Sequence, residues 1–119
     1  MTSKGELRVP DYLEHIVEAI GRIQRYTKDM TETVFLRDEK TQDAVVRNIE
    51  IIGEASKNIR DADPQFAIKH PDIPWSMMYR MRNAVSHGYF SVDLEVVWHT
   101  IHNDLPGLEK SIQELRSAP

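Results

Sequence analysis

Apolar residues recur along this chain at steps of three and four, the spacing of one face of an α-helix. A first amphipathic helix is predicted after Pro10, and the polar stretch 28–33 interrupts the pattern. A second helix is predicted from near Asp38 to the turn before Pro64, because a residue that precedes proline is disfavoured in the helical region. The apolar stripes of these two helices are Leu13, Ile16, Val17, Ile20, Ile23 and Tyr26, then Val45, Ile49, Ile52, Ala55 and Ile59.

The second half of the chain also shows a helical period. Residues 64–74 are crowded with prolines and allow at most one short helical turn. A third helix is predicted to open at Pro74 or Trp75, since proline suits the first helical position. It is expected to stop near Gly88, because glycine tolerates the left-handed conformation that closes many helices.

A last and longest helix is predicted from about Ser91 or Val92. Its apolar residues follow a heptad pattern that is typical of packed bundles, and Pro106 predicts a kink or break inside it. No stretch alternates as a strand would. The sequence therefore predicts an all-α, antiparallel four-helix bundle with one additional short helical turn, in a single domain over residues 1–119. The first ten or so residues and the last few are expected to be flexible. The heptad residues are Trp98, Ile101, Leu105, Leu108, Ile112 and Leu115.

Composition narrows the class of protein. The chain has no Cys, which removes disulfides and thiolate chemistry, and no apolar run long enough for a signal peptide or a membrane span. A cytoplasmic protein without a membrane partner is the expectation. The net charge of −4 argues against a general nucleic-acid coat protein, although residues 47–87 hold six Lys or Arg against five Asp or Glu. A local phosphate site remains open.

One short stretch, Arg82-Asn83-Ala84-Val85-Ser86-His87-Gly88-Tyr89, combines residues that carry chemistry. Asn83 and His87 are four apart and share a helical face, so the amide can orient the imidazole. Arg82 and His87 diverge by roughly 140° on a straight helix, and only the long arginine or a local break can bring them together. The other interpretation is a helix end whose cations complement the helix dipole, and the spacing alone does not separate the two.

The residue types suit RNA cleavage without a metal. Arginine offers a planar fork of donors to a phosphate, and histidine exchanges protons near neutral pH. A base that draws the proton from a 2′-OH, with a cation beside the phosphorus oxygens, is sufficient for such cleavage. Glu95, His99 and His102 also have helical spacing, but they lack a fourth ligand, so no metal site is predicted there. Glu54 and Lys57 are expected to form a salt link on a solvated face.

The stretch RNAVSHGY resembles the R-x4-H-x-Y signature of HepT-like toxins, a branch of the HEPN superfamily. The blocks at 47–59, 73–75 and 92–98 look similar too, and the likeness covers roughly residues 10–115. This resemblance implies an all-helical, homodimeric endoribonuclease that needs no metal or other cofactor, with active sites in the cleft between two protomers. It places the family's catalytic pair on Arg82 and His87, with Asn83 as the polar residue that follows the arginine.

The resemblance also implies a partner, an MntA-like minimal nucleotidyltransferase antitoxin that transfers AMP to the motif tyrosine, here Tyr89. The added charge would compete for Arg82, and the added bulk would block the RNA backbone. Our hypothesis is that Tyr89 is a switch more than a catalyst. Two rival functions stay open. The first is a helical interaction module that cuts no RNA and is bound and modified by a nucleotidyltransferase. The second is a helical subunit that supplies nucleotide contacts to a partner enzyme.

Overall fold

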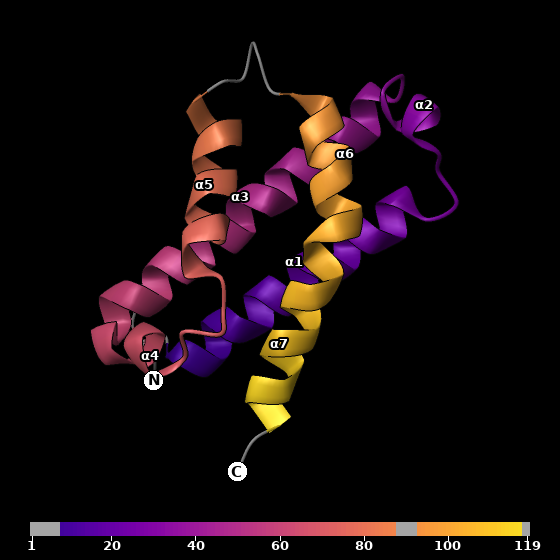
Figure 1. Ribbon diagram of the computed structural model, residues 1–119. Coiled ribbons are helices and arrows are strands. Elements are labelled where there is room, and N and C mark those ends of the chain that lie inside the picture. The colour runs from indigo at the N-terminus through magenta and orange to yellow at the C-terminus, as the bar shows by residue number, and fades with distance from the viewer. Residues whose placement is uncertain (1–7, 88–92, 118–119) are drawn as a thin grey trace.

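The computed structural model describes residues 8–87 and 93–117, with the backbone alone for 84–87. Within these ranges the chain is helical and has no strand, so the prediction of an all-α fold is confirmed. Figure 1 shows α1 and α3 running diagonally across the back of the molecule, with α5 in front of α3 and the α6–α7 column in front of α1. The helices are α1 (Val9–Thr27), α2 (Glu32–Phe35), α3 (Glu39–Ala62), α4 (Pro64–Lys69), α5 (Trp75–His87), α6 (Leu94–Asn103) and α7 (Leu105–Ser117).

Polar side chains fix the start of several helices. The carboxylate of Asp38 accepts a hydrogen bond from the backbone N–H of Thr41 at 3.0 Å, and Asp93 accepts from two amides in the first turn of α6. These bonds satisfy N–H groups that have no partner inside the helix. Pro10 and Pro64 lie in the first turns of α1 and α4, where a missing N–H has no cost. The predicted helix starts near Asp38 and at Pro74 or Trp75 are confirmed, since α3 begins at Glu39 and α5 begins at Trp75.

Two details differ from the sequence expectation. The interrupted segment after α1 contains the short helix α2, which Thr31 caps by accepting a hydrogen bond from the amide of Val34 at 3.2 Å. Four residues are too few to show a period, so hydrophobic patterning does not detect such a turn. The long last helix is divided at Asp104, so that Pro106 lies in the first turn of α7 instead of inside a continuous helix. The predicted break is thus confirmed, but the prediction that this helix is the longest was wrong, since α6 and α7 have 10 and 13 residues and α3 has 24.

The core is built from the buried faces of α1, α3, α5, α6 and α7, with Phe35 of α2, and it follows the predicted stripes closely. Tyr26 is an exception, since 40% of its surface is exposed at the end of α1, and its assignment to the stripe was wrong. None of the described helices combines the length and apolarity needed to cross a bilayer. Residues with at most 1% exposure include Ile16, Ile20, Ile23, Phe35, Val45, Ile49, Ile52, Ile59, Ile73, Met78, Leu105 and Ile112.

Candidate active site

Helix α5 carries residues 82–87 of the candidate motif and packs against the middle of α3. The two helices run antiparallel, because Tyr79 contacts Ser56 whereas Arg82, further along α5, lies against Gly53, earlier on α3. The backbone carbonyl of Met78, whose side chain is buried, also lies against Gly53 from the α5 side. This packing places Arg82 at a defined position on α3.

Gly53 is what allows α5 to come so close to α3. A Cβ atom at this position would lie 2.1 Å from Cβ and 2.6 Å from Cγ of Arg82, and 3.2 Å from the carbonyl oxygen of Met78. Real Cβ atoms do not approach other atoms this closely, so a side chain here would push Arg82 and α5 away. Glycine inside a helix is unfavourable by roughly 1 kcal/mol relative to alanine, and the close contact of the two helices offsets that cost.

The guanidinium group of Arg82 forms an ion pair with the carboxylate of Glu54, with 2.5 Å between Nη2 and Oε1. Glu54 directly follows Gly53. The residue that leaves room for the aliphatic part of the Arg82 side chain is therefore adjacent to the residue that binds its guanidinium group. The two side chains are 34% and 46% exposed, which leaves the guanidinium accessible from solvent. The predicted link between Glu54 and Lys57 was wrong, since Lys57 pairs with Asp61 at 3.3 Å instead.

Asn83 also contacts the arginine. Its side-chain oxygen accepts a hydrogen bond from Nη1 of Arg82 at 3.4 Å. The helical backbone of α5 is described as far as His87, and the predicted stop near Gly88 lies outside the described residues. The side chain of His87 and the whole of Tyr89 lie outside the described residues. The convergence of Arg82 and His87, and the orientation of the imidazole by Asn83, therefore stay predictions.

A second polar contact between α3 and α5 lies one helical turn from Arg82. The Tyr79 hydroxyl donates a hydrogen bond to the carbonyl oxygen of Ser56 at 3.4 Å, and the guanidinium carbon of Arg60 lies 4.7 Å from the centre of the tyrosine ring. Burial raises the pKa of the Tyr79 phenol above its ordinary value of 10.0, although the charge of Arg60 opposes this shift. The phenol is therefore a neutral donor at neutral pH.

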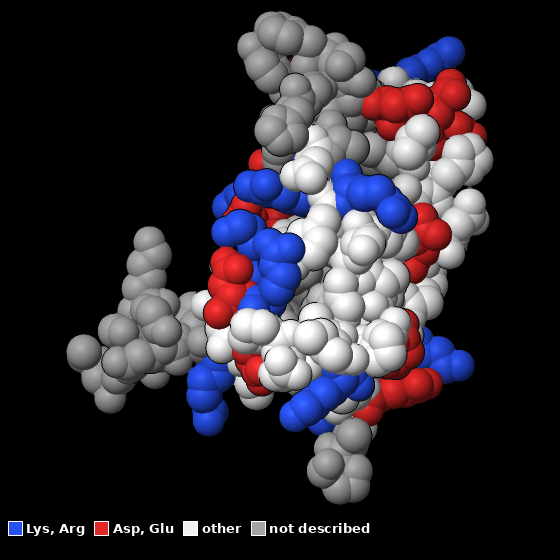
Figure 2. Space-filling view, turned by 60° about the vertical axis from the view of Figure 1, so that its left-hand side comes forward, with Lys and Arg blue, Asp and Glu red and all other residues white. Residues whose placement is uncertain are grey.

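Charged side chains are mixed on the surface beside this contact. Figure 2 shows Lys and Arg interleaved with Asp and Glu along one side of the visible face, next to a broad uncharged area. Lys57 and Arg60 have side chains that are 47% and 54% exposed, and Arg80 is also exposed. Exposed cations on α3 and α5 can contact phosphate groups, but the neighbouring carboxylates keep the surface from being broadly basic.

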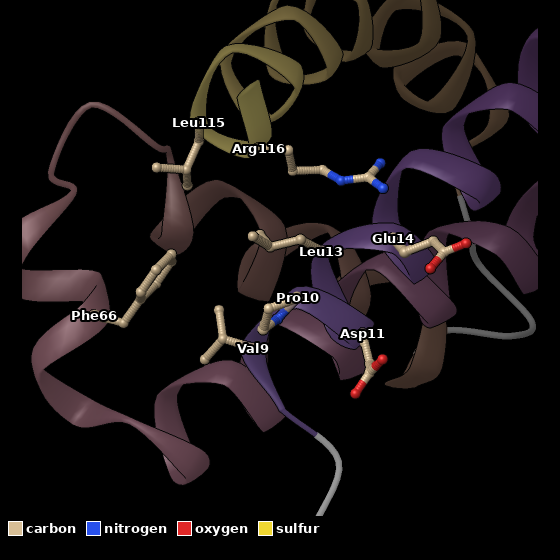
Figure 3. Close-up of a pocket in the computed structure, with 8 residues that line it drawn as sticks. All are labelled: Val9, Pro10, Asp11, Leu13, Glu14, Phe66, Leu115 and Arg116. Atoms are coloured by element: carbon tan, nitrogen blue, oxygen red, sulfur yellow. The ribbon is translucent and has the colours of Figure 1, made fainter. Parts of the chain in front are cut away.

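A separate cavity of about 470 Å³ lies where α1 begins and α7 ends. Figure 3 shows Phe66 of α4 and Leu115 of α7 facing Val9 at the start of α1, with the charged side chains of Glu14 and Arg116 to one side. Figure 1 places this region at the opposite end of the bundle from the C-terminal end of α5. The cavity is therefore not part of the candidate site.

The histidines considered as metal ligands have other neighbours. His99 Nε2 lies 3.9 Å from a carboxylate oxygen of Glu32, and His102 Nδ1 lies 3.0 Å from the carbonyl oxygen of Trp98. The His102 ring also packs on the Trp98 ring, with 4.2 Å between their centres. In the described ranges 8–87 and 93–117, no group of three or more His, Asp or Glu side chains is arranged to hold a metal ion.

Sequence reasoning found Arg82 but missed the two residues of α3 that contact it. The signal was present in the adjacent pair Gly53-Glu54. A glycine inside an otherwise regular amphipathic helix often marks a close approach of another backbone or side chain. An acidic residue beside such a point can meet a cation from the approaching helix, but only the structure shows that this cation is Arg82.

Comparison with known proteins gives matches over most of the chain. The model of the family "Ribonuclease HepT-like" matches residues 16–115. A relative from Thermococcus cleftensis, named "Probable ribonuclease HepT", is 49% identical over 106 residues, which cover 89% of this chain and 94% of the relative. A Methanocaldococcus jannaschii protein named as a "putative RNase" is 40% identical, over 87% of this chain and 84% of the relative. No solved structure matches this chain significantly.

Proposed function

Because the chain belongs to the HepT-like ribonuclease family, we propose that it is a metal-independent endoribonuclease whose catalytic residues are Arg82 and His87. The names of its relatives support ribonuclease activity. The observation that carries the assignment of the site is the position of Arg82. It is fixed against α3 by Gly53 and Glu54, yet its guanidinium group is still accessible to a phosphate.

The proposed reaction is an attack of the ribose 2′-oxygen on the adjacent phosphorus. A base takes the 2′ proton, the bond from phosphorus to the 5′-oxygen breaks, and the departing 5′-oxygen receives a proton from an acid. His87 can serve in either proton transfer, because an imidazole near its ordinary pKa, about 6.5, both accepts and donates at neutral pH. Arg82 would stabilise the additional negative charge on the phosphoryl oxygens in the transition state.

Asn83 is proposed to orient the imidazole of His87 from one turn earlier on α5. Its side-chain oxygen is engaged by Arg82, so the amide NH2 group is the part that remains to bind an imidazole nitrogen. In this arrangement Asn83 would link the cation and the proton-transfer group of the same site.

We further propose that the protein acts as a homodimer, with the two active sites in the cleft between protomers. Large apolar side chains near α5 and α6 support this proposal. Met77, Met81 and Trp98 are only partly buried in the single chain, and Val96 is 58% exposed. A Val96→Glu protein that sediments as a monomer, when the parent sediments as a dimer, would support this interface. A variant that remains fully dimeric would count against it.

The biological role that we propose is that of a toxin in a toxin–antitoxin pair. Its partner would be an MntA-like minimal nucleotidyltransferase, which silences the toxin by transferring AMP to Tyr89. This part of the proposal rests on the resemblance of residues 82–89 to the motif of HepT-like toxins. A Tyr89→Phe protein should escape silencing by the antitoxin while it still cuts RNA. If the antitoxin silences that variant fully, the switch is located elsewhere.

The direct test of the activity uses purified protein, a mixed RNA substrate and an excess of EDTA. We expect cleavage to survive chelation and to be lost in both Arg82→Ala and His87→Ala, with the helical circular dichroism of each variant unchanged. Full activity of either variant would refute the assigned site. Absence of cleavage of any RNA by the parent protein would favour the rival function, an interaction module that its partner modifies.

A further inference from the structure

We propose that Glu54 is a positioning residue, which holds the guanidinium group of Arg82 in the orientation needed at the scissile phosphate. This inference rests on the proposed function, in which Arg82 contacts that phosphate. It adds a residue from α3, outside the R-x4-H-x-Y motif, to the active site. Glu54 itself is not expected to contact RNA, because its carboxylate is negatively charged and already engaged with Arg82.

The contacts of Arg82 fix both ends of its side chain. Its Cβ and Cγ atoms pass directly over Gly53, where there is no side chain between them and the α3 backbone. At the other end, Nη2 is bound by Glu54 and Nη1 donates to Asn83 at 3.4 Å. A guanidinium group has five N–H donors in a rigid plane, so fixing two of its nitrogens sets the direction of the remaining donors.

The pair differs from an ordinary surface ion pair on the same helix. Lys57 and Asp61 are four residues apart on α3, and their side chains are 47% and 56% exposed. Such a pair adds little to stability and constrains nothing beyond its own helix. Glu54 and Arg82 belong to different helices and meet at the point where Gly53 brings those helices together, and Arg82 is only 34% exposed. The position of Glu54 therefore determines the position of a group on α5.

An arginine whose guanidinium group is held in one orientation accelerates catalysis more than it strengthens the binding of RNA. A donor that is already oriented needs no rearrangement when negative charge develops in the transition state, and its effect is expressed in kcat. Arg82 would keep its charge without Glu54 and could still attract the RNA backbone, but its head would sample other rotamers. Loss of Glu54 should therefore lower kcat and leave KM nearly unchanged.

The experiment compares Glu54→Gln and Glu54→Asp with the matched control Asp61→Asn, which removes an acidic charge from the same helix and breaks a different ion pair. We expect Glu54→Gln to lower kcat on the order of ten- to a hundred-fold with KM within about two-fold of the parent. Glu54→Asp should recover part of the rate, because it restores the charge at a slightly shorter reach. Asp61→Asn should cleave at the parental rate. A Glu54→Gln enzyme as fast as the parent, or faster, would overturn the proposal.

A spectroscopic readout tests the positioning independently of turnover. In 15N-labelled protein, the Nη–H signals of Arg82 are identified by their disappearance in Arg82→Ala. Because Glu54 binds Nη2 and Asn83 binds Nη1, we expect these signals to be protected from exchange in the parent and in Asp61→Asn, and to exchange faster in Glu54→Gln. Unchanged protection in Glu54→Gln would overturn the proposal. If Arg82→Ala cleaves fully, the proposed function fails; if Arg82→Ala is inactive and Glu54→Gln is fully active, only the role of Glu54 fails.

Discussion

Helix α3 packs against α1 on one side and against α5 on another, and the two contacts differ in the size and polarity of their residues. The contact with α1 is built from branched aliphatic side chains, of which Ile16, Ile20 and Ile23 are fully buried. The contact with α5 contains Gly53, the buried hydroxyl of Ser56 and the ion pair of Glu54. The first contact mainly buries apolar area, whereas the second sets the position of a charged side chain.

This difference shows how one helix serves both stability and the candidate site. Aliphatic packing tolerates small changes in shape, because its free energy depends mostly on area and volume. The α5 contact depends on distances of a few tenths of an ångström around Gly53, since a single added carbon would overlap Arg82. Substitutions on the α1 side should therefore change stability, and substitutions on the α5 side should change cleavage.

The largest effect on stability is expected in the α1–α3 core. Replacing Ile20, which has no exposed surface, by Ala should lower the free energy of unfolding by about 2–5 kcal/mol, because it removes buried methyl groups and leaves a cavity. Urea denaturation measures the loss. Cleavage by the fraction that remains folded should match the parent at low temperature. A loss of cleavage without a loss of stability would contradict the division between the two contacts.

A smaller effect on stability, with a larger effect on cleavage, is expected at Gly53. Alanine gains about 1 kcal/mol in helix propensity, but overpacking against Arg82 costs about 1–3 kcal/mol, so Gly53→Ala should be destabilised by up to about 2 kcal/mol. Cleavage should fall because Arg82 is displaced. Gly107→Ala on α7 is the control, since nothing lies within 4 Å of its added Cβ. It should be neutral or slightly stabilised, and equally active; a Gly53→Ala protein with the same behaviour would refute the close contact.

The smallest effect is expected at Asp38, which caps α3 and so supports both contacts equally. Its hydrogen bonds to Thr41 lower the pKa of the carboxyl below the ordinary value of 3.8. The cap therefore stabilises the fold fully above that value, and this contribution is lost as the pH falls through the lowered pKa. The difference in melting temperature between the parent and Asp38→Ala should be present at neutral pH and shrink in acid. A difference that grows on acidification would contradict this account.

Much of the fold could be predicted from the sequence, because burial on a helix leaves a period that is visible residue by residue. The stripe through Ile16, Ile20 and Ile23 lies in the core as expected. Of the heptad residues, Trp98 and Leu115 are only partly buried against the core, and the other four are buried as predicted: Ile101, Leu105, Leu108 and Ile112. Tyr26 continues the stripe in sequence but is 40% exposed, whereas the next residue, Thr27, is buried although it is the last residue of α1. Periodicity indicates the buried face of a helix but does not separate neighbouring residues at the edge of that face.

The candidate site was only partly accessible to such reasoning. Arg82 and Asn83 were found because they lie in a short motif with recognisable chemistry. The sequence predicted a salt bridge between Glu54 and Lys57, because residues three apart on a helix are neighbours. The actual partner of Glu54 is Arg82, which lies on another helix and 28 residues later in the sequence. Side-chain pairing between helices depends on their relative rotation and separation, which a single sequence does not encode in any local pattern.

The most direct test of the account is the chemistry of a single phosphodiester bond. An RNA oligonucleotide with one mapped cleavage site is incubated with the protein in EDTA, beside the same oligonucleotide with 2′-deoxyribose on the 5′ side of that bond. Attack by the 2′-oxygen predicts a 2′,3′-cyclic phosphate and a 5′-OH end from the first, and no cleavage of the second at that bond. Equal cleavage of the deoxy-substituted bond, or products with 3′-OH and 5′-phosphate ends, would contradict the account.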